Sequence, residues 1–176
     1  MRRSSKIVVL CHCLLNANAK VRPLATYPAA LPSILQAFPS AGLFQLPCPE
    51  TSFLGLNRWG MTREQYDQPA FRRHCRRLLE PCLDQIEALL RDGCVLQALV
   101  GVDGSPSCGM FRTCTGYRGG EISSPSTDAA GQVGGLAMVP GHGVFMEELL
   151  SMLKERGIDA PAMAVDEEAP DNLITS

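Results

Sequence analysis

The sequence of 176 residues predicts one α/β domain with a mostly parallel sheet and helices on both faces. Short apolar runs rich in β-branched residues are typical of buried strands. They alternate with segments whose apolar residues recur every three or four positions, which is the spacing of one helix face. This alternation is characteristic of a parallel sheet with right-handed crossovers. We expect strands at residues 6–10, 43–46, 95–102 and 162–165.

Proline and capping residues set the limits of the first two predicted helices. A short helix at 31–38 has Pro32 in its first turn, where proline is tolerated, and it stops before Pro39. Thr62 and Gln65 have the spacing of a capping box. A second helix is therefore expected to begin at Thr62.

The longest predicted helix restarts after Pro69 and ends at Gly93. A further helix at 142–156 precedes the last strand. Residues 119–140 contain much Gly, Ser and Thr without a clear period, so we expect a long loop or lid over the site. The whole chain, 1–176, is expected to form one domain.

Composition excludes several classes of protein. Apolar residues make up 45% of the chain and charged residues 19%, and the net charge is −2, which indicates neither disorder nor a strongly basic nucleic-acid binder. The apolar run at 7–10 is too short for a signal-peptide core, and no span has membrane length. Eight cysteines without a secretory signal indicate a reducing compartment, so we expect a cytoplasmic protein.

Three cysteines lie in short phrases that each directly follow a predicted strand. They are Cys13, Cys48 and Cys108. Because parallel strands bring their carboxyl ends to one edge of the sheet, we expect the three thiols to meet there. Four thiolates close an iron-sulfur cluster, whereas three leave one iron open to a substrate atom. An open iron beside Glu50 and Ser105 predicts catalysis.

The ordered set of phrases resembles the thiouracil desulfidase family over roughly residues 6–165. The phrases are Cys13-Leu14-Leu15, Cys48-Pro49-Glu50 and Ser105-Pro106-Ser107-Cys108-Gly109. The resemblance implies a single Rossmann-like domain with a [4Fe-4S] cluster held by the three cysteines. It also implies a small thiolated substrate, a pyrimidine base, nucleoside or nucleotide or a related thio-compound. It also implies that C=S becomes C=O with release of sulfide and no net redox change. The family's acidic and hydroxyl catalytic residues fall on Glu50 and Ser105.

Two segments depart from the family pattern near the expected pocket. Asn16 stands where a glycine is usual, and residues 54–60 replace a segment rich in Gly and Pro. We therefore expect the cluster chemistry to be kept while the substrate differs. Asn16 is accordingly a candidate for substrate contact.

Four further residues are candidates for substrate contact. Arg58 suits a phosphate and Trp59 suits stacking on a base, although a lone tryptophan more often packs. His142 stands at a predicted helix start, where amides bind an anion, and a plain capping role is equally consistent. Ser107 adjoins the last cysteine of the motif.

Other interpretations of the cysteine set stay open. One is a non-catalytic metal-binding module, either an iron or redox sensor or a zinc-stabilised domain with His12 or Cys11 as fourth ligand. Another is a set of buried thiols without metal. Cys11, which shares a strand face with Cys13 by period-two geometry, and Cys114 are candidates for a spare ligand or a sulfur acceptor.

The remaining cysteines and the arginine-rich helix have plainer interpretations. Cys75, Cys82 and Cys94 lie on apolar faces and are expected to pack in the core. Nucleic acid is a partner that the charges allow but do not favour, since a solvated, partly paired helix face explains the arginines, with Glu80 answering Arg76. The arginines in question are Arg72, Arg73, Arg76 and Arg77.

Overall fold

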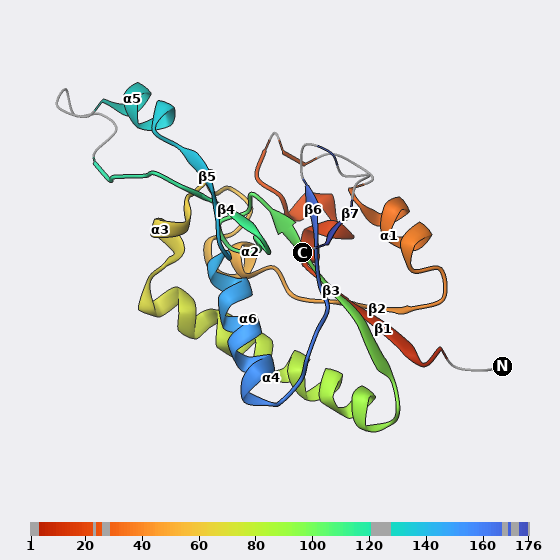
Figure 1. Ribbon diagram of the computed structural model, residues 1–176. Coiled ribbons are helices and arrows are strands. Elements are labelled where there is room, and N and C mark those ends of the chain that lie inside the picture. The colour runs from red at the N-terminus through yellow and green to blue at the C-terminus, as the bar shows by residue number, and fades with distance from the viewer. Residues whose placement is uncertain are drawn as a thin grey trace.

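The main sheet has five strands in the order β2-β1-β3-β6-β7, and all but the last are parallel to their neighbours (Figure 1). The computed structural model describes residues 4–22, 24–25, 29–120, 128–166, 169 and 173–175. The strands are β1 Lys6–Leu10, β2 Gly42–Gln45, β3 Val95–Asp103, β6 Ala162–Asp166 and β7 Leu173–Thr175. The predicted α/β class is confirmed, and β7 is an antiparallel strand that the sequence did not predict.

Helices cover both faces of this sheet (Figure 1). The longest, α4, packs against α6 on one side, and α1 lies on the other. The bounds are α1 Leu31–Ala37, α2 Pro49–Leu54, α3 Arg63–Tyr66, α4 Pro69–Arg91, α5 Ala129–Gly134 and α6 Val144–Glu155. The predicted capping box is present at the start of α3, where the Gln65 side chain accepts a hydrogen bond from the Thr62 amide. Among the described residues, none of the helices combines the length and the apolar character needed to cross a bilayer.

The core forms where apolar side chains of the central strands meet the helices. Val8 and Leu10 of β1 are fully buried, as expected for a strand covered on both faces. The predicted apolar face of α4, which includes Cys75, is buried against them. Cys82 and Cys94 are partly buried and pack against the same core, which confirms the packing interpretation of these cysteines.

A separate two-stranded sheet replaces part of the long loop expected at 119–140. Arg112–Thr115 (β4) pairs antiparallel with Ala137–Pro140 (β5), and α5 lies beyond them at the outer end of this unit (Figure 1). The prediction of a continuous loop is therefore wrong at 129–134 and 137–140, and residues 121–127 lie outside the described part of the chain. Strands of four residues separated by more than twenty positions carry too little periodicity to be recognised from sequence.

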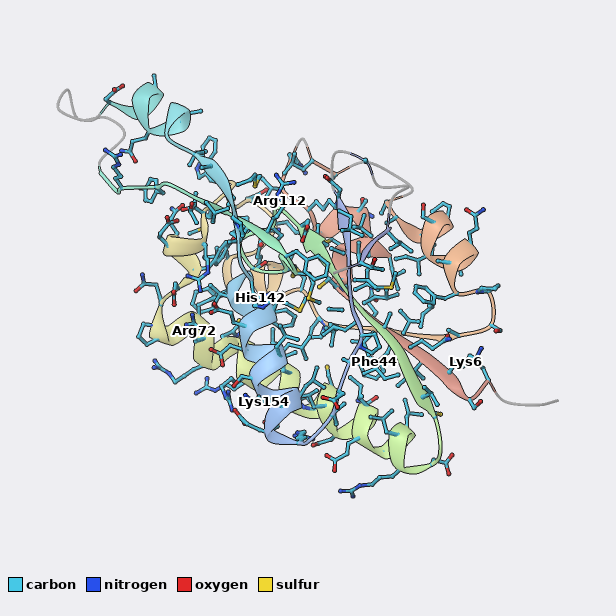
Figure 2. The ribbon with its side chains drawn as sticks, in the orientation of Figure 1. Lys6, Phe44, Arg72, Arg112, His142 and Lys154 are labelled. Carbon is cyan, nitrogen blue, oxygen red and sulfur yellow. The ribbon has the colours of Figure 1, made fainter. Side chains whose placement is uncertain are left out.

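The arginines of α4 are engaged in ion pairs with α6. Arg72 binds Glu148 at 2.7 Å, and Arg76 binds the same carboxylate at 3.2 Å (Figure 2). Glu80, predicted to answer Arg76, instead binds Arg156 at 2.9 Å, because α6 supplies closer acidic partners for Arg76. The paired-face interpretation is thus confirmed for Arg72 and Arg76.

The strand order places a switch point between β1 and β3, since the chain turns to β2 on one side of β1 and to β3 on the other. In open parallel sheets ligands bind outside the carboxyl ends of the strands at such a point. The segments that follow β1, β2 and β3 carry Cys13, Cys48 and Cys108. The fold therefore brings these three segments to one edge, as predicted.

Candidate metal centre and active site

One pocket of about 190 Å³ lies at this edge and is lined by all three predicted ligands. Glu50, Ser105 and Ser107 line it as well. Its other walls are mainly apolar. The complete lining is Cys13, Ala19, Lys20, Val21, Leu24, Cys48, Glu50, Arg58, Gly60, Met61, Gly104, Ser105, Pro106, Ser107, Cys108, Cys114 and Met138.

Cys13 lies in a short 3-10 helix, His12–Leu14, directly after β1. The Gln45 side chain donates to the His12 carbonyl at 2.9 Å and ties this turn to the end of β2. Because β1 ends at Leu10, Cys13 does not continue the strand, and the prediction that it shares a strand face with Cys11 is wrong. The helical turn directs Cys13 to the pocket, whereas Cys11 is fully buried.

Cys48 is the N-cap of α2, a helix that the sequence did not predict. Its sulfur accepts a hydrogen bond from the Thr51 amide at 3.5 Å. Pro49 occupies the first helical position, where its fixed φ is suited and its missing amide costs nothing. Glu50 follows in the first turn. The Cys-Pro-Glu phrase therefore places a thiol and a carboxylate side by side on the same pocket wall.

Cys108 lies in a loop that its own side chains and α6 hold in shape. The Ser105 hydroxyl accepts a hydrogen bond from the Cys108 amide at 3.0 Å. The amides of Val144 and Met146, in the first turn of α6, donate to carbonyls of the same loop at 3.0 and 3.1 Å. A side chain at Gly143 would collide with the Ser107 carbonyl, so glycine is required for this approach. The loop that carries Cys108 is thus a rigid support.

Cys108 is buried beside a second thiol. The neighbouring Cys11 thiol and the burial of the site raise the pKa of Cys108 well above its ordinary value. The thiol is therefore neutral in the absence of metal, and a metal would displace its proton on binding.

Glu50 is held by two donors and is only 9% exposed. Arg58 donates from Nε to one carboxylate oxygen at 2.8 Å, and Ser107 donates from its hydroxyl to the other at 2.5 Å. The two side chains of the Arg58–Glu50 pair are 4% and 11% exposed, so this is a buried ion pair. The remaining guanidinium nitrogens donate to the carbonyls of Gly55 and Ala19. The carboxylate is fixed in direction at the pocket wall.

Tyr66 adds a buried phenol next to this network. Its ring is 2% exposed, and burial together with the charge of Glu50 raises the pKa of its hydroxyl. In the described part of the chain, no atom lies in hydrogen-bonding geometry to that hydroxyl. Tyr66 is therefore a neutral polar group left without a partner close to Glu50.

Several residues predicted to contact substrate have structural roles instead. Arg58 lines the pocket, and its guanidinium donates to Glu50 and to two backbone carbonyls. Trp59 is 83% exposed and is not part of the pocket lining. The Asn16 side chain caps the next turn by accepting from the Asn18 amide at 3.2 Å. The His142 ring contacts the Met110 carbonyl, and its place at the start of α6 (Figure 2) agrees with the structural interpretation.

Sequence reasoning missed the soft and apolar walls of the pocket. Met61 and Met138 line it together with Leu24, and Cys114 joins them from β4. Single methionines in loops and short strands give no periodic signal, so only the fold could bring them together. Ser107 was a candidate for substrate contact, and the structure places its hydroxyl on Glu50.

The three cysteines meet the requirements of an iron-sulfur cluster. Within the described residues, no three His, Cys, Asp or Glu side chains converge closely enough to hold one metal ion. A mononuclear zinc site needs every ligand at about 2.0–2.3 Å from one point. Cluster cysteines each bind a different iron and so need only surround a common space, which Cys13, Cys48 and Cys108 do. Of the two residues proposed as a fourth zinc ligand, His12 is not in the pocket lining and lies against Asn16, whereas Cys11 is buried next to the Cys108 thiol.

Comparisons with known proteins give a family but no activity. No family model matches the chain. A solved structure described as a [4Fe-4S]-dependent thiouracil desulfidase aligns over 93% of this chain and 91% of its own, with 18% identity and a TM-score of 0.43, a score too low to establish a common fold. An uncharacterized protein of Methanocaldococcus jannaschii is 31% identical over 112 residues, which span 62% of this chain and 71% of that protein. The chain therefore belongs to the same family as this archaeal protein.

Proposed function

We propose that the protein is a [4Fe-4S]-dependent desulfidase that converts C=S to C=O on a small thiolated compound. The observation that carries the proposal is the shared pocket, in which three cysteines from three adjacent strand ends surround one space beside a buried carboxylate. The motif resemblance supports the same chemistry. A non-catalytic metal-binding module does not require a carboxylate beside the cysteines, whereas the proposal requires Glu50 there.

Cys13, Cys48 and Cys108 hold the cluster in this proposal. When bound, the cluster supplies a soft Lewis-acidic iron without a protein ligand, suited to a thiocarbonyl sulfur. The three thiols have different supports. One lies on a short helical turn, one at a helix N-cap and one in a loop that is hydrogen-bonded to α6. The three supports come from separate elements, so the ligand positions are fixed independently.

Glu50 acts as the general acid/base. Its carboxylate accepts a proton from the water that attacks the thiocarbonyl carbon and returns a proton to the departing sulfur. The overall change is R₂C=S + H₂O → R₂C=O + H₂S, which balances without an oxidant or reductant. Arg58 keeps the carboxylate in one orientation, since it is itself anchored to two backbone carbonyls.

The two serines have different tasks. Ser107 donates a hydrogen bond directly to the Glu50 carboxylate. Its hydroxyl can therefore stabilise the negative charge of Glu50 whenever the carboxylate is ionised during the reaction. Ser105 accepts from the Cys108 amide and lines the pocket, which makes it a support of the ligand loop with access to substrate. Ser105 was the predicted catalytic hydroxyl, and Ser107 is the one in contact with the proposed base.

The pocket favours a thiolated base over a nucleotide within the predicted substrate range. Its volume of about 190 Å³, which the cluster and the substrate would share, lies below the roughly 300–1,000 Å³ of typical ligand sites. The Arg58 guanidinium already donates to the Glu50 carboxylate, so it is poorly suited to bind a phosphate as well. The walls formed by Met61, Met138 and Leu24 suit a flat, apolar, sulfur-bearing ring.

The test is sulfide release from a panel of thiopyrimidine bases by anaerobically reconstituted protein. We expect wild type to release sulfide and Glu50→Gln to retain its iron while turnover falls by at least about a hundredfold, the usual contribution of a general acid/base. Glu80→Gln is the matched control, since Glu80 lies on the exposed face of α4. Full activity in the Glu50→Gln protein would remove Glu50 from the mechanism.

A further inference from the structure

Cys114 is a fourth cysteine in the pocket that the three-ligand scheme leaves without a role. It lines the same space as Cys13, Cys48 and Cys108, yet it comes from β4 of the small sheet and not from an edge of the main sheet. Its cross-strand partner in β5 is Met138, which also lines the pocket. The small sheet therefore presents a thiol and a thioether to the space enclosed by the three ligands.

The position of Cys114 is fixed relative to the loop that carries Cys108. The amide of Gly104 donates to the Arg112 carbonyl at 3.1 Å, and the Thr113 hydroxyl donates to the Ser105 carbonyl at 3.2 Å. On the far side, the Gly116 amide donates to the Glu64 carboxylate at 2.8 Å. Cys114 is thus held between two anchored points.

The other cysteines outside the motif do not share this setting. Cys75 is fully buried in α4, and Cys82 and Cys94 pack against the core away from the pocket. Cys11 is fully buried and lies behind Cys108 without lining the space. Among the eight cysteines, four face one pocket, which is the number that closes a cubane cluster.

We infer that Cys114 is an exchangeable fourth ligand, which closes the cluster when no substrate is bound and is displaced by the sulfur of the substrate. This inference rests on the proposed cluster function. A closed cluster exposes no iron to oxygen, and an exchange of one sulfur donor for another involves no redox change. Placement on the small sheet gives Cys114 a support separate from those of the permanent ligands.

The test measures alkylation of Cys114 by iodoacetamide, mapped by mass spectrometry on the full chain. We expect reaction at Cys114 to be about tenfold slower in the cluster-loaded protein than in the cluster-free protein, since a metal-bound thiolate is shielded. Sodium hydrosulfide, a small soft sulfur donor, should restore the reaction to the rate of cluster-free protein treated in the same way, with iodoacetamide in large excess because hydrosulfide also consumes it. Equal rates with and without cluster would overturn the inference, and so would protection that hydrosulfide does not relieve.

A second readout follows iron loss in air. Cys114→Ser should bind the full complement of iron and lose it several-fold faster than wild type, while Cys94→Ser, at the opposite end of β3 from the pocket, should lose it at the wild-type rate. Cys114→Ser protein that is as stable in air as wild type would contradict the inference alone. Absence of iron from wild type would end both this inference and the proposed function, so the two failures are distinguishable.

Discussion

At the scale of single residues, the site is organised around a buried charge. Glu50 and Arg58 form an ion pair with little access to water, and the Ser107 hydroxyl donates a second hydrogen bond to the carboxylate. Burial removes the hydration of both charges, so each depends on the other. Arg58 is therefore a positioning residue for Glu50.

Removal of Arg58 should destabilise the fold strongly. Arg58→Met leaves the Glu50 charge buried with one hydroxyl donor, a change that costs about 3–5 kcal/mol of unfolding free energy. The double variant Glu50→Gln/Arg58→Met should recover part of the loss, because the orphaned charge is gone. Urea unfolding of the cluster-free proteins measures both. A single variant within about 0.5 kcal/mol of wild type, the range of ordinary surface substitutions, would mean that the pair is not buried.

The residues also mark the limit of what the sequence could predict. The convergence of Cys13, Cys48, Cys108 and Glu50 on one pocket was predictable, because each cysteine follows a strand in a short phrase and Glu50 adjoins one of them. The Arg58–Glu50 contact was not, because it depends on how α2 and the following turn bring residues eight positions apart together. Trp59 follows directly and is exposed outside the pocket lining, a placement that the sequence could not give.

At the scale of elements, α6 supports the ligand loop and α4 together. Its first-turn amides bind loop carbonyls, and its acidic side chains bind arginines of α4. Gly143 sits at the contact with the loop, where a Cβ atom has no room. The element thereby couples the long helix to the position of Cys108.

A methyl group at this contact should disturb the metal centre. Gly143→Ala forces the loop away from α6 and should cost about 1–3 kcal/mol, the usual range for overpacking, and lower the iron bound per chain. Gly134→Ala in α5 is the matched control, since nothing surrounds that position. Iron content and urea unfolding report the two effects. Identical behaviour of the two variants would show that the α6 contact does not position the loop.

Acid should weaken the link between α3 and α4. The hydrogen bond from Arg72 lowers the pKa of Asp67 below its usual value. The stabilisation is therefore present above the unfolded-state pKa of about 3.9 and is lost as pH falls through the lower folded-state pKa. Asp67→Asn should cost under about 1 kcal/mol at pH 7, because the pair is partly exposed, and nothing below the folded-state pKa.

Urea unfolding at neutral and acid pH measures this difference. The same substitution at exposed Asp159 controls for loss of one negative charge. A stability gap between wild type and Asp67→Asn that grows toward acid would contradict the assignment.

At the scale of the whole molecule, the strand order explains how distant phrases form one site. β2, β1 and β3 are neighbours in the sheet, and the segments after their carboxyl ends bring Cys48, Cys13 and Cys108 to one pocket at the switch point. The alternation of apolar runs predicted this edge, since parallel topology follows from pattern alone. The small sheet was not predicted, because its short strands pair across a long segment, and with it the contribution of Cys114 to the pocket stayed hidden.

The most direct test of the central claim is the amount of iron and acid-labile sulfide per chain after anaerobic reconstitution. Wild type, Cys108→Ser and Cys94→Ser are compared, since Cys108 and Cys94 lie beyond opposite ends of β3. We predict about four irons and four sulfides, the content of a cubane cluster, in wild type and Cys94→Ser, and a loss of most of both in Cys108→Ser. No iron in wild type, or equal iron in wild type and Cys108→Ser, would contradict the three-cysteine cluster.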